Sequence, residues 1–251
     1  MSSRSGGKGE TIHVSKFGAW VRAVGGVIVF LYLPAILRKV FIALGGAWAL
    51  DSVRQQVTLF LSAGLIGDWL FVMMLAFYLR REGRTLGELG FTHRGTLVGW
   101  VVSALVTAFF GAGVILGALG GRAPLLEISA FNIYNSLAAA LGPGVCEEIV
   151  FRGFVMTELQ RARVSRLTQV LASGILFGLA HVGWGTLTGD VNWLAVASAG
   201  LNTAMLGALY GVVYLISRRS LWPAMAGHAL GNLVIEPWLL LAGLSATIGP
   251  R

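Results

Sequence analysis

Seven apolar stretches, each long enough to cross a lipid bilayer, limit what this 251-residue chain can fold into. A helix rises about 1.5 Å per residue and the hydrocarbon core of a bilayer is about 30 Å thick, so about 20 apolar residues suffice. Backbone polar groups in lipid must bond within their own segment, which favours α-helices. The sequence therefore predicts an all-α, polytopic transmembrane helical bundle of about seven to eight spans. The seven expected spans are residues 17–37, 57–79, 96–119, 131–157, 168–188, 193–216 and 221–243.

The composition supports a membrane protein and excludes several other classes. Hydrophobic residues make up 56% of the chain and charged residues only 12%, which is about half the charged share of an ordinary soluble domain. A single cysteine excludes a disulfide framework and cysteine-rich zinc or iron-sulfur sites, and four histidines leave few ways to build a metal centre. The net charge of +8 is interpreted as basic cytoplasmic loops rather than as a nucleic-acid-binding surface.

Three regions are expected along the chain. Residues 1–16 are rich in serine and glycine, which predicts a disordered cytoplasmic head. Residues 17–128 hold the N-terminal transmembrane helices, and residues 129–243 form a core that carries the polar motifs. The apolar run from Val40 to Leu50 is too short for a full span, so an interfacial helix and an eighth, partial crossing both stay open.

The positions of lysine and arginine predict the orientation in the membrane. Most of the 19 such residues lie in the head and in alternate loops, for example at Arg80, Arg161 and Arg218. Cytoplasmic loops carry an excess of these residues, so we expect the N-terminus in the cytoplasm.

Ionisable residues within a span are costly and mark candidate functional sites. The fourth stretch carries the largest such cluster, Glu147, Glu148 and Arg152. Glu148 and Arg152 are four residues apart and can pair on one helix face, while Glu147 lies about 100° round the helix. One carboxylate is then neutralised, and the other is suited to act as a general base or acid. The alternative is that all three residues only hold helices together.

Two later spans add histidines at helical spacing. Phe177 and His181 are four residues apart in the fifth stretch, and so are His228 and Asn232 in the seventh. Counted at about 1.5 Å per residue from the cytoplasmic end of each span, the polar groups lie about 10 to 20 Å deep. They are therefore expected to meet in one cavity within the cytoplasmic half of the bundle.

At these residues the chain resembles the CPBP family of intramembrane proteases, also called the ABI family, which includes the CAAX prenyl endopeptidase of the Rce1 type. The three family motifs are Glu-Glu-x-x-x-Arg, Phe-x-x-x-His and His-x-x-x-Asn/Asp. The resemblance covers about residues 129–241, and the N-terminal half matches no motif. The motifs occur in order and on separate spans, as Glu147-Glu148-x-x-x-Arg152, Phe177-x-x-x-His181 and His228-x-x-x-Asn232.

The resemblance implies an intramembrane endopeptidase that uses an activated water. Glu147 and His181 would activate the water to attack a peptide carbonyl. His228 and Asn232 would stabilise the oxyanion, since imidazole and amide N–H groups are suitable donors.

The resemblance also implies supporting residues, and it leaves the role of a metal open. Glu148 with Arg152 would support the catalytic residues, and Phe177 would wall the pocket. We expect no cofactor, because the chain lacks a His-Glu-x-x-His motif and Asn232 is a poor zinc ligand. A divalent metal such as zinc stays an alternative, with the ligands Glu147, Glu148, His181 and His228.

The expected partners are the lipid bilayer and a substrate that is a membrane protein or a lipidated peptide, with no nucleic acid. The short head and the lack of an added domain resemble prokaryotic relatives, which predicts the inner membrane of a prokaryotic cell. Two other functions stay open. One is a proton-coupled small membrane carrier that uses the buried groups as a relay, and the other is a catalytically idle immunity or scaffold protein. The sequence indicates neither the natural substrate nor the oligomeric state.

Overall fold

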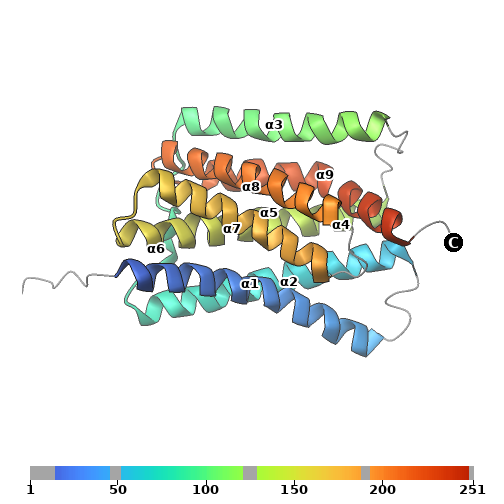
Figure 1. The fold of residues 1–251 in the computed structure, drawn as a ribbon, viewed down its shortest axis with the longest axis horizontal. Helices are drawn as coiled ribbons and strands as arrows, with labels where there is room; N and C mark the ends of the chain where they lie inside the picture. The colour runs from blue at the N-terminus through green and yellow to red at the C-terminus, as the bar shows by residue number, and fades with distance from the viewer. Residues whose placement is uncertain (1–14, 46–51, 121–128, 188–192, 249–251) are drawn as a thin grey trace, which may run out of the picture.

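The computed structural model describes residues 15–45, 52–120, 129–187 and 193–248. These ranges contain helices and no strand, which confirms the all-α class (Figure 1). The expected disordered head, residues 1–16, lies almost wholly outside them. The described helices are α1 (Lys16–Gly45), α2 (Val53–Arg81), η2 (Leu86–Leu89), α3 (Leu97–Gly120), α4 (Ala130–Leu141), α5 (Pro143–Glu148), η3 (Ile149–Val155), α6 (Met156–Arg161), α7 (Arg166–Leu187), α8 (Trp193–Ile216) and α9 (Trp222–Ile248).

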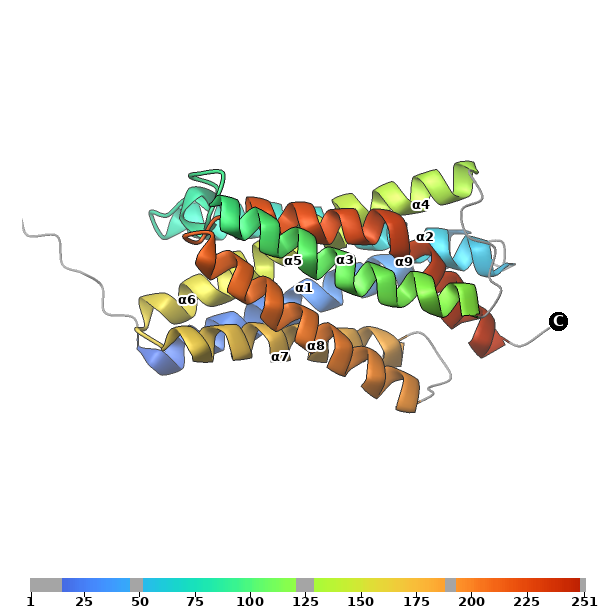
Figure 2. The same cartoon turned by 90° about the horizontal axis from the view of Figure 1, so that it is seen from above.

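The long helices lie side by side along the long axis of the molecule (Figures 1 and 2). α1 and α2 pack together at one edge of the bundle in Figure 1, and α3 lies at the opposite edge against α8 and α9. α5, η3 and α6 continue one another between these groups, and every side chain from Cys146 to Leu159 is buried. This central segment carries the Glu147, Glu148 and Arg152 cluster.

The apolar helices make the protein an integral membrane protein. Three described helices are long and apolar enough to cross a bilayer, namely Lys16–Gly45, Arg54–Arg81 and Val196–Ile216. Leu97–Gly113 is a shorter apolar helix. Large hydrophobic side chains such as Phe109 are exposed on the outside of the bundle, which suits contact with lipid. The count of seven spans stays a prediction.

The apolar run from Val40 to Leu50 is not a separate element over its described part. α1 continues without a break through Gly45, and residues 46–51 lie outside the described ranges. No proline or glycine lies between Pro34 and Gly45, so nothing interrupts the helical hydrogen bonds. The expectation of an interfacial helix or an extra crossing is therefore wrong as far as Gly45.

The fourth expected span, residues 131–157, is not one regular helix. α4 ends before Gly142, whose φ of −83° and ψ of −96° are not helical, and α5 begins at Pro143. Proline donates no backbone N–H and suits the first turn of a new helix, which explains the break. A Cβ at Gly142 would lie 3.0 Å from the Cα of Leu65, so glycine also allows α2 to approach. Beyond α5, Ile149–Val155 is a π-helix, a form often found at functional sites.

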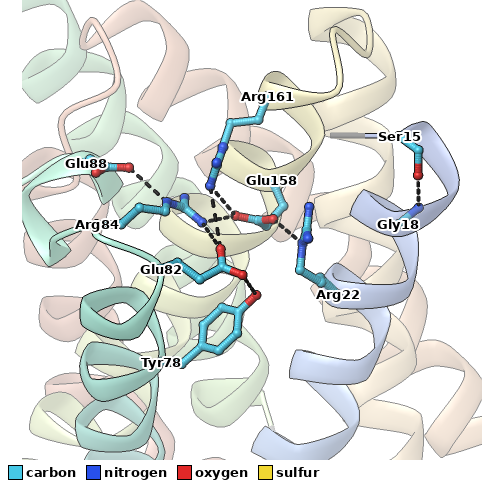
Figure 3. A network of polar contacts seen from close by, with 9 residues as sticks. All are labelled: Ser15, Gly18, Arg22, Tyr78, Glu82, Arg84, Glu88, Glu158 and Arg161. Atoms are coloured by element: carbon cyan, nitrogen blue, oxygen red, sulfur yellow. Dashed lines mark hydrogen bonds and ion pairs between the residues drawn. The ribbon is translucent and has the colours of Figure 1, made fainter. Parts of the chain in front are cut away.

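A cluster of charges joins α1, α6 and the loop after α2 (Figure 3). Glu158 is 0% exposed and accepts hydrogen bonds from Arg84 Nη1 at 2.6 Å and Arg22 Nε at 2.7 Å. Arg84 also donates to Glu88 at 3.0 Å. Burial acts to lower the pKa of Arg84, but its bonds to Glu88 and Glu158 outweigh this, and the pKa lies above its ordinary value. The guanidinium therefore stays charged, and the cluster holds α6 against α1 and α2.

Candidate active site

Glu148 is the centre of the polar contacts in the core. Its Oε1 atom accepts a hydrogen bond from Arg152 Nη1 at 2.8 Å, which confirms the expected pairing four residues apart. The same oxygen bonds His228 Nδ1 at 2.8 Å, so α9 is joined to the central segment. Glu148 and Arg152 are both 0% exposed, and His228 is 5% exposed. These charged groups lie in the interior of the bundle, where each one would destabilise the fold if its partner of opposite charge were removed.

Glu147 lies on the other side of the His228 ring. Its Oε2 atom is 3.7 Å from His228 Nε2, and the residue is 6% exposed. This separation is longer than a direct hydrogen bond and short enough for one water to contact both atoms. A carboxylate oxygen only accepts, so the bond to ionised Glu148 places a proton on His228 Nδ1. The imidazole is thereby oriented with Nε2 toward Glu147.

Phe177 contacts three of the polar groups. Its ring centroid lies 4.6 Å from that of His181 and 5.8 Å from that of His228. The guanidinium carbon of Arg152 lies 4.7 Å from the same ring centroid. The side chain is 1% exposed, so it separates these groups from water and lowers the local dielectric constant.

His181 is oriented by its own helix. Its Nδ1 atom lies 2.9 Å from the backbone oxygen of Phe177, one turn earlier on α7. A carbonyl oxygen only accepts, so Nδ1 carries the proton and Nε2 of the neutral ring is an acceptor. The two histidines expected at one depth therefore lie beside the same phenylalanine, each with Nδ1 engaged.

Asn232 lies one turn after His228 on α9 and is partly buried. Its Nδ2 donates to the backbone oxygen of Ala139 on α4, at 3.3 Å. An amide nitrogen carries two hydrogens, so this bond leaves the second N–H as a donor. The contact also holds α9 against the helix that precedes the break at Gly142.

α8 contributes two groups that sequence reasoning missed. The backbone oxygen of Gly207 accepts a hydrogen bond from Arg152 Nη2 at 2.9 Å. The ring of Tyr210 stacks on His228, with centroids 5.6 Å apart and an angle of 20° between the planes. Neither residue belongs to a motif, and an aromatic residue in an apolar stretch is usually interpreted as packing. The feature of the sequence that could have pointed to this pair is that Gly207 and Tyr210 lie three residues apart in one apolar stretch.

The described residues do not gather into a metal-binding group. No three side chains of His, Cys, Asp or Glu type lie close enough to hold an ion within those parts of the chain. Of the ligands named as an alternative, Glu148 has its Oε1 bonded to Arg152 and His228. In this arrangement, one oxygen of Glu148 is therefore already engaged by two side chains.

One comparison with known proteins gives a match, and it covers this site. Residues 129–234 match the family model described as Type II CAAX prenyl endopeptidase Rce1-like. No curated protein and no solved structure matches the chain. The matched segment holds all three sequence motifs and the site built from α5, η3, α7, α8 and α9. Through this segment, the chain is similar to the Rce1-like family of type II CAAX prenyl endopeptidases.

Proposed function

We propose that this protein is an intramembrane endopeptidase that hydrolyses a peptide bond of a membrane-associated protein, lipidated or not. The observation that carries the proposal is the 3.7 Å approach of Glu147 Oε2 to His228 Nε2 inside the segment that matches the family. A carboxylate and an imidazole at this separation can hold one water between them. The similarity to the family model alone supports the coarser statement, a CAAX-type membrane protease.

Glu147 is the proposed general base, and His181 assists it. Because the Nδ1–H of His181 is bonded to Phe177, its Nε2 is the atom that accepts a hydrogen bond from the water. The water oxygen attacks the substrate carbonyl carbon while Glu147 takes the proton. Glu147 then gives that proton to the leaving amine nitrogen, which completes cleavage of the C–N bond.

His228 and Asn232 are the proposed donors to the oxyanion. With Nδ1 bonded to Glu148, the ring atom of His228 that can donate to the oxyanion is Nε2, which points toward the Glu147 side, where the tetrahedral intermediate forms. Glu148 lies on the other side of the same ring. Asn232 supplies the N–H that is not bonded to Ala139. Such donors, fixed before the reaction, stabilise the developing charge.

Arg152 and Phe177 support this arrangement. Arg152 holds Glu148 in place by a buried hydrogen bond of 2.8 Å, and Gly207 fixes the other end of the guanidinium. Phe177 keeps bulk water from the polar groups, which strengthens each electrostatic interaction.

The proposed setting follows the distribution of charges. We propose that the N-terminus is cytoplasmic, that the site opens to the cytoplasmic half of the bilayer and that the membrane is the inner membrane of a prokaryotic cell. The proposed partners are the bilayer and a membrane protein or lipidated peptide substrate, and neither a metal nor a nucleic acid is part of the proposal.

The test is cleavage of a library of lipidated and unlipidated C-terminal peptides by the purified protein in detergent. Glu147→Gln removes the base while keeping the side-chain shape, and we expect cleavage to fall by about 10²-fold to 10⁴-fold. Glu88→Gln is the matched control, because Glu88 is 44% exposed and lies far outside the site segment in sequence. The control should cleave like the wild type, with and without a chelator.

Each other outcome would contradict a stated part of the proposal. Full cleavage by Glu147→Gln would mean that another group is the base. Loss of wild-type cleavage on chelation would require a metal. Proton-coupled uptake into vesicles that Glu147→Gln stops, without peptide cleavage, would favour the carrier. Partner binding that survives Glu147→Gln, again without cleavage, would favour the scaffold protein.

A further inference from the structure

We propose that Tyr210 is a positioning residue for His228 and that α3, which lies outside the segment that matches the family, holds Tyr210 in place. The inference rests on the proposed function only for its kinetic consequence. The geometry itself concerns three helices, with His228 on α9, Tyr210 on α8 and Thr107 on α3.

The His228 ring is held by two aromatic rings at different angles. Tyr210 stacks on one face with planes 20° apart, and Phe177 meets the ring at 79° with centroids 5.8 Å apart. The hydrogen bond to Glu148 opposes large turns about the Cβ–Cγ bond, because they would carry Nδ1 away from its partner, but a single bond leaves smaller turns of the ring possible. A flat ring packed on the face opposes that turn, so Tyr210 keeps Nε2 directed toward Glu147.

Tyr210 is in turn held from outside the matched segment. Its hydroxyl lies 3.0 Å from Thr107 Oγ1, and Thr107 Oγ1 donates its single hydrogen to the backbone oxygen of Ser103 at 2.9 Å. The tyrosine hydroxyl is therefore the donor in the Tyr210 to Thr107 bond. Tyr210 is 1% exposed and Thr107 is partly buried, so burial limits the competition from water for this bond.

The residue before the catalytic histidine makes this approach sterically possible. A Cβ at Gly227 would lie 2.7 Å from Thr107 Oγ1 and 3.1 Å from the Tyr210 hydroxyl. Ser103 Oγ also donates to the backbone oxygen of Pro223, which joins α3 to the start of α9. The first half of the chain thus takes part in orienting a residue of the second half.

The kinetic test compares Tyr210→Leu with Tyr210→Phe. Leucine removes the flat ring, and we expect kcat to fall by about tenfold or more with KM little changed, because a small misplacement of a catalytic group is costly. Phenylalanine keeps the stacked ring and should retain most of kcat. Tyr214→Leu is the matched control, since Tyr214 is a tyrosine one turn further along α8, is 0% exposed and bonds a backbone oxygen outside the site.

A double-mutant cycle tests the hold from α3. Tyr210→Phe and Thr107→Val remove the same hydrogen bond, so each should lower kcat slightly and the double variant should be no worse than either single one. Additive losses would overturn the role assigned to Thr107. An equal fall of kcat in Tyr210→Leu and Tyr214→Leu would overturn the role assigned to Tyr210.

A spectroscopic measurement separates this inference from the proposed function. With ¹⁵N-labelled histidine, the four histidines give few ring signals, and His228→Gln assigns the one of interest. We expect a single, well-ordered Nδ1-protonated ring in the wild type and in Tyr210→Phe, and an averaged signal in Tyr210→Leu. An unchanged His228 signal in Tyr210→Leu would refute the positioning role whether or not the protein cleaves peptides.

Discussion

Glu148 and Glu158 lie on the same buried helical segment, and each is fully buried against an arginine, yet the two clusters differ in composition. Glu158 bonds Arg84 and Arg22, which come from the N-terminal part of the chain. Glu148 bonds Arg152 on its own helix and His228 on α9. The Glu158 cluster contains carboxylates and guanidinium groups, whereas the Glu148 cluster also contains an imidazole.

A buried ion pair that only holds helices together differs from a catalytic site in the kind of groups that contact the buried carboxylate. Arginine stays protonated throughout the working range, so the Glu158 cluster can hold helices but cannot pass a proton. An imidazole can both accept and donate a proton, and Glu147 lies 3.7 Å from that of His228. Burial of charge alone is therefore weak evidence of function, and the kind of partner decides.

Glu148→Gln should have the largest effect, because it alters both stability and activity. It leaves the fully buried Arg152 without its counter-ion, and breaking such a pair costs about 3 to 5 kcal/mol of unfolding free energy. It also removes the negative charge that orients His228 and replaces one carboxylate oxygen by an NH2 donor, so cleavage should fall strongly in the fraction that folds. Denaturant unfolding in detergent and peptide cleavage measure the two effects. Wild-type activity in a folded variant would contradict the role given to Glu148.

Glu158→Gln should lower the unfolding free energy and leave the kcat of the folded protein unchanged. Arg84 is 5% exposed and keeps Glu88 as a partner, so we expect a loss of about 3 kcal/mol, at the lower end for a broken buried pair. The kcat of the folded protein should stay at the wild-type value, since no group of the site is touched. A fall in kcat that exceeds the loss of folded protein would mean that this cluster also controls the site.

Asn232→Ala should act on the rate more than on the fold. Removing one oxyanion donor lowers kcat by about 10²-fold to 10³-fold, with substrate binding little affected. The lost bond to Ala139, at 3.3 Å, is long and lies at a partly buried residue, so stability should change by about 1 kcal/mol. The readouts are kcat and KM on the best peptide, together with thermal unfolding. If kcat were unchanged, the oxyanion donors would have to be sought elsewhere.

Arg22→Gln should have the smallest effect of the four. The Arg22 side chain is 29% exposed, and Glu158 keeps its bond from Arg84 after the change. Partly exposed ion pairs contribute less than about 1 kcal/mol, and salt screens them. Thermal unfolding at low and high salt measures this, and the difference from wild type should shrink at high salt. A loss as large as that of Glu158→Gln would show that Arg22, rather than Arg84, holds α6.

Much of the site could be predicted because its spacing is local. Glu148 and Arg152 pair as their four-residue separation predicts, and Phe177 contacts His181 one turn later on α7. The sharing of Glu148 with His228 could not be predicted, since it depends on how α9 is rotated against α5. Glu158 was missed because a charged residue near the end of an apolar stretch is usually solvated, and here two other helices cover it.

The break in the fourth span illustrates a different failure. Pro143 was visible in the sequence, but the apolar length of residues 131–157 predicted one helix. The close approach of Leu65 to Gly142 accommodates the break, and only the packed bundle contains that contact. Trp69 Nε1 donates to the backbone oxygen of Leu141 at 3.0 Å, so α2 satisfies a carbonyl that the broken helix leaves unbonded.

The amino-acid sequence by itself determined the class of fold and the chemistry available, because apolar length and helical spacing are properties of neighbouring residues. It predicted a helical membrane bundle and the motifs that contain Glu147, His181 and His228. Which atoms meet depends on the tertiary structure. In the folded bundle, Nδ1 of His228 bonds Glu148, Nε2 of His228 points toward Glu147, and the ring of Tyr210 stacks on the face of the His228 ring. The physical reason is that the rotation and depth of each helix are set by side-chain packing against its neighbours, which no local pattern encodes.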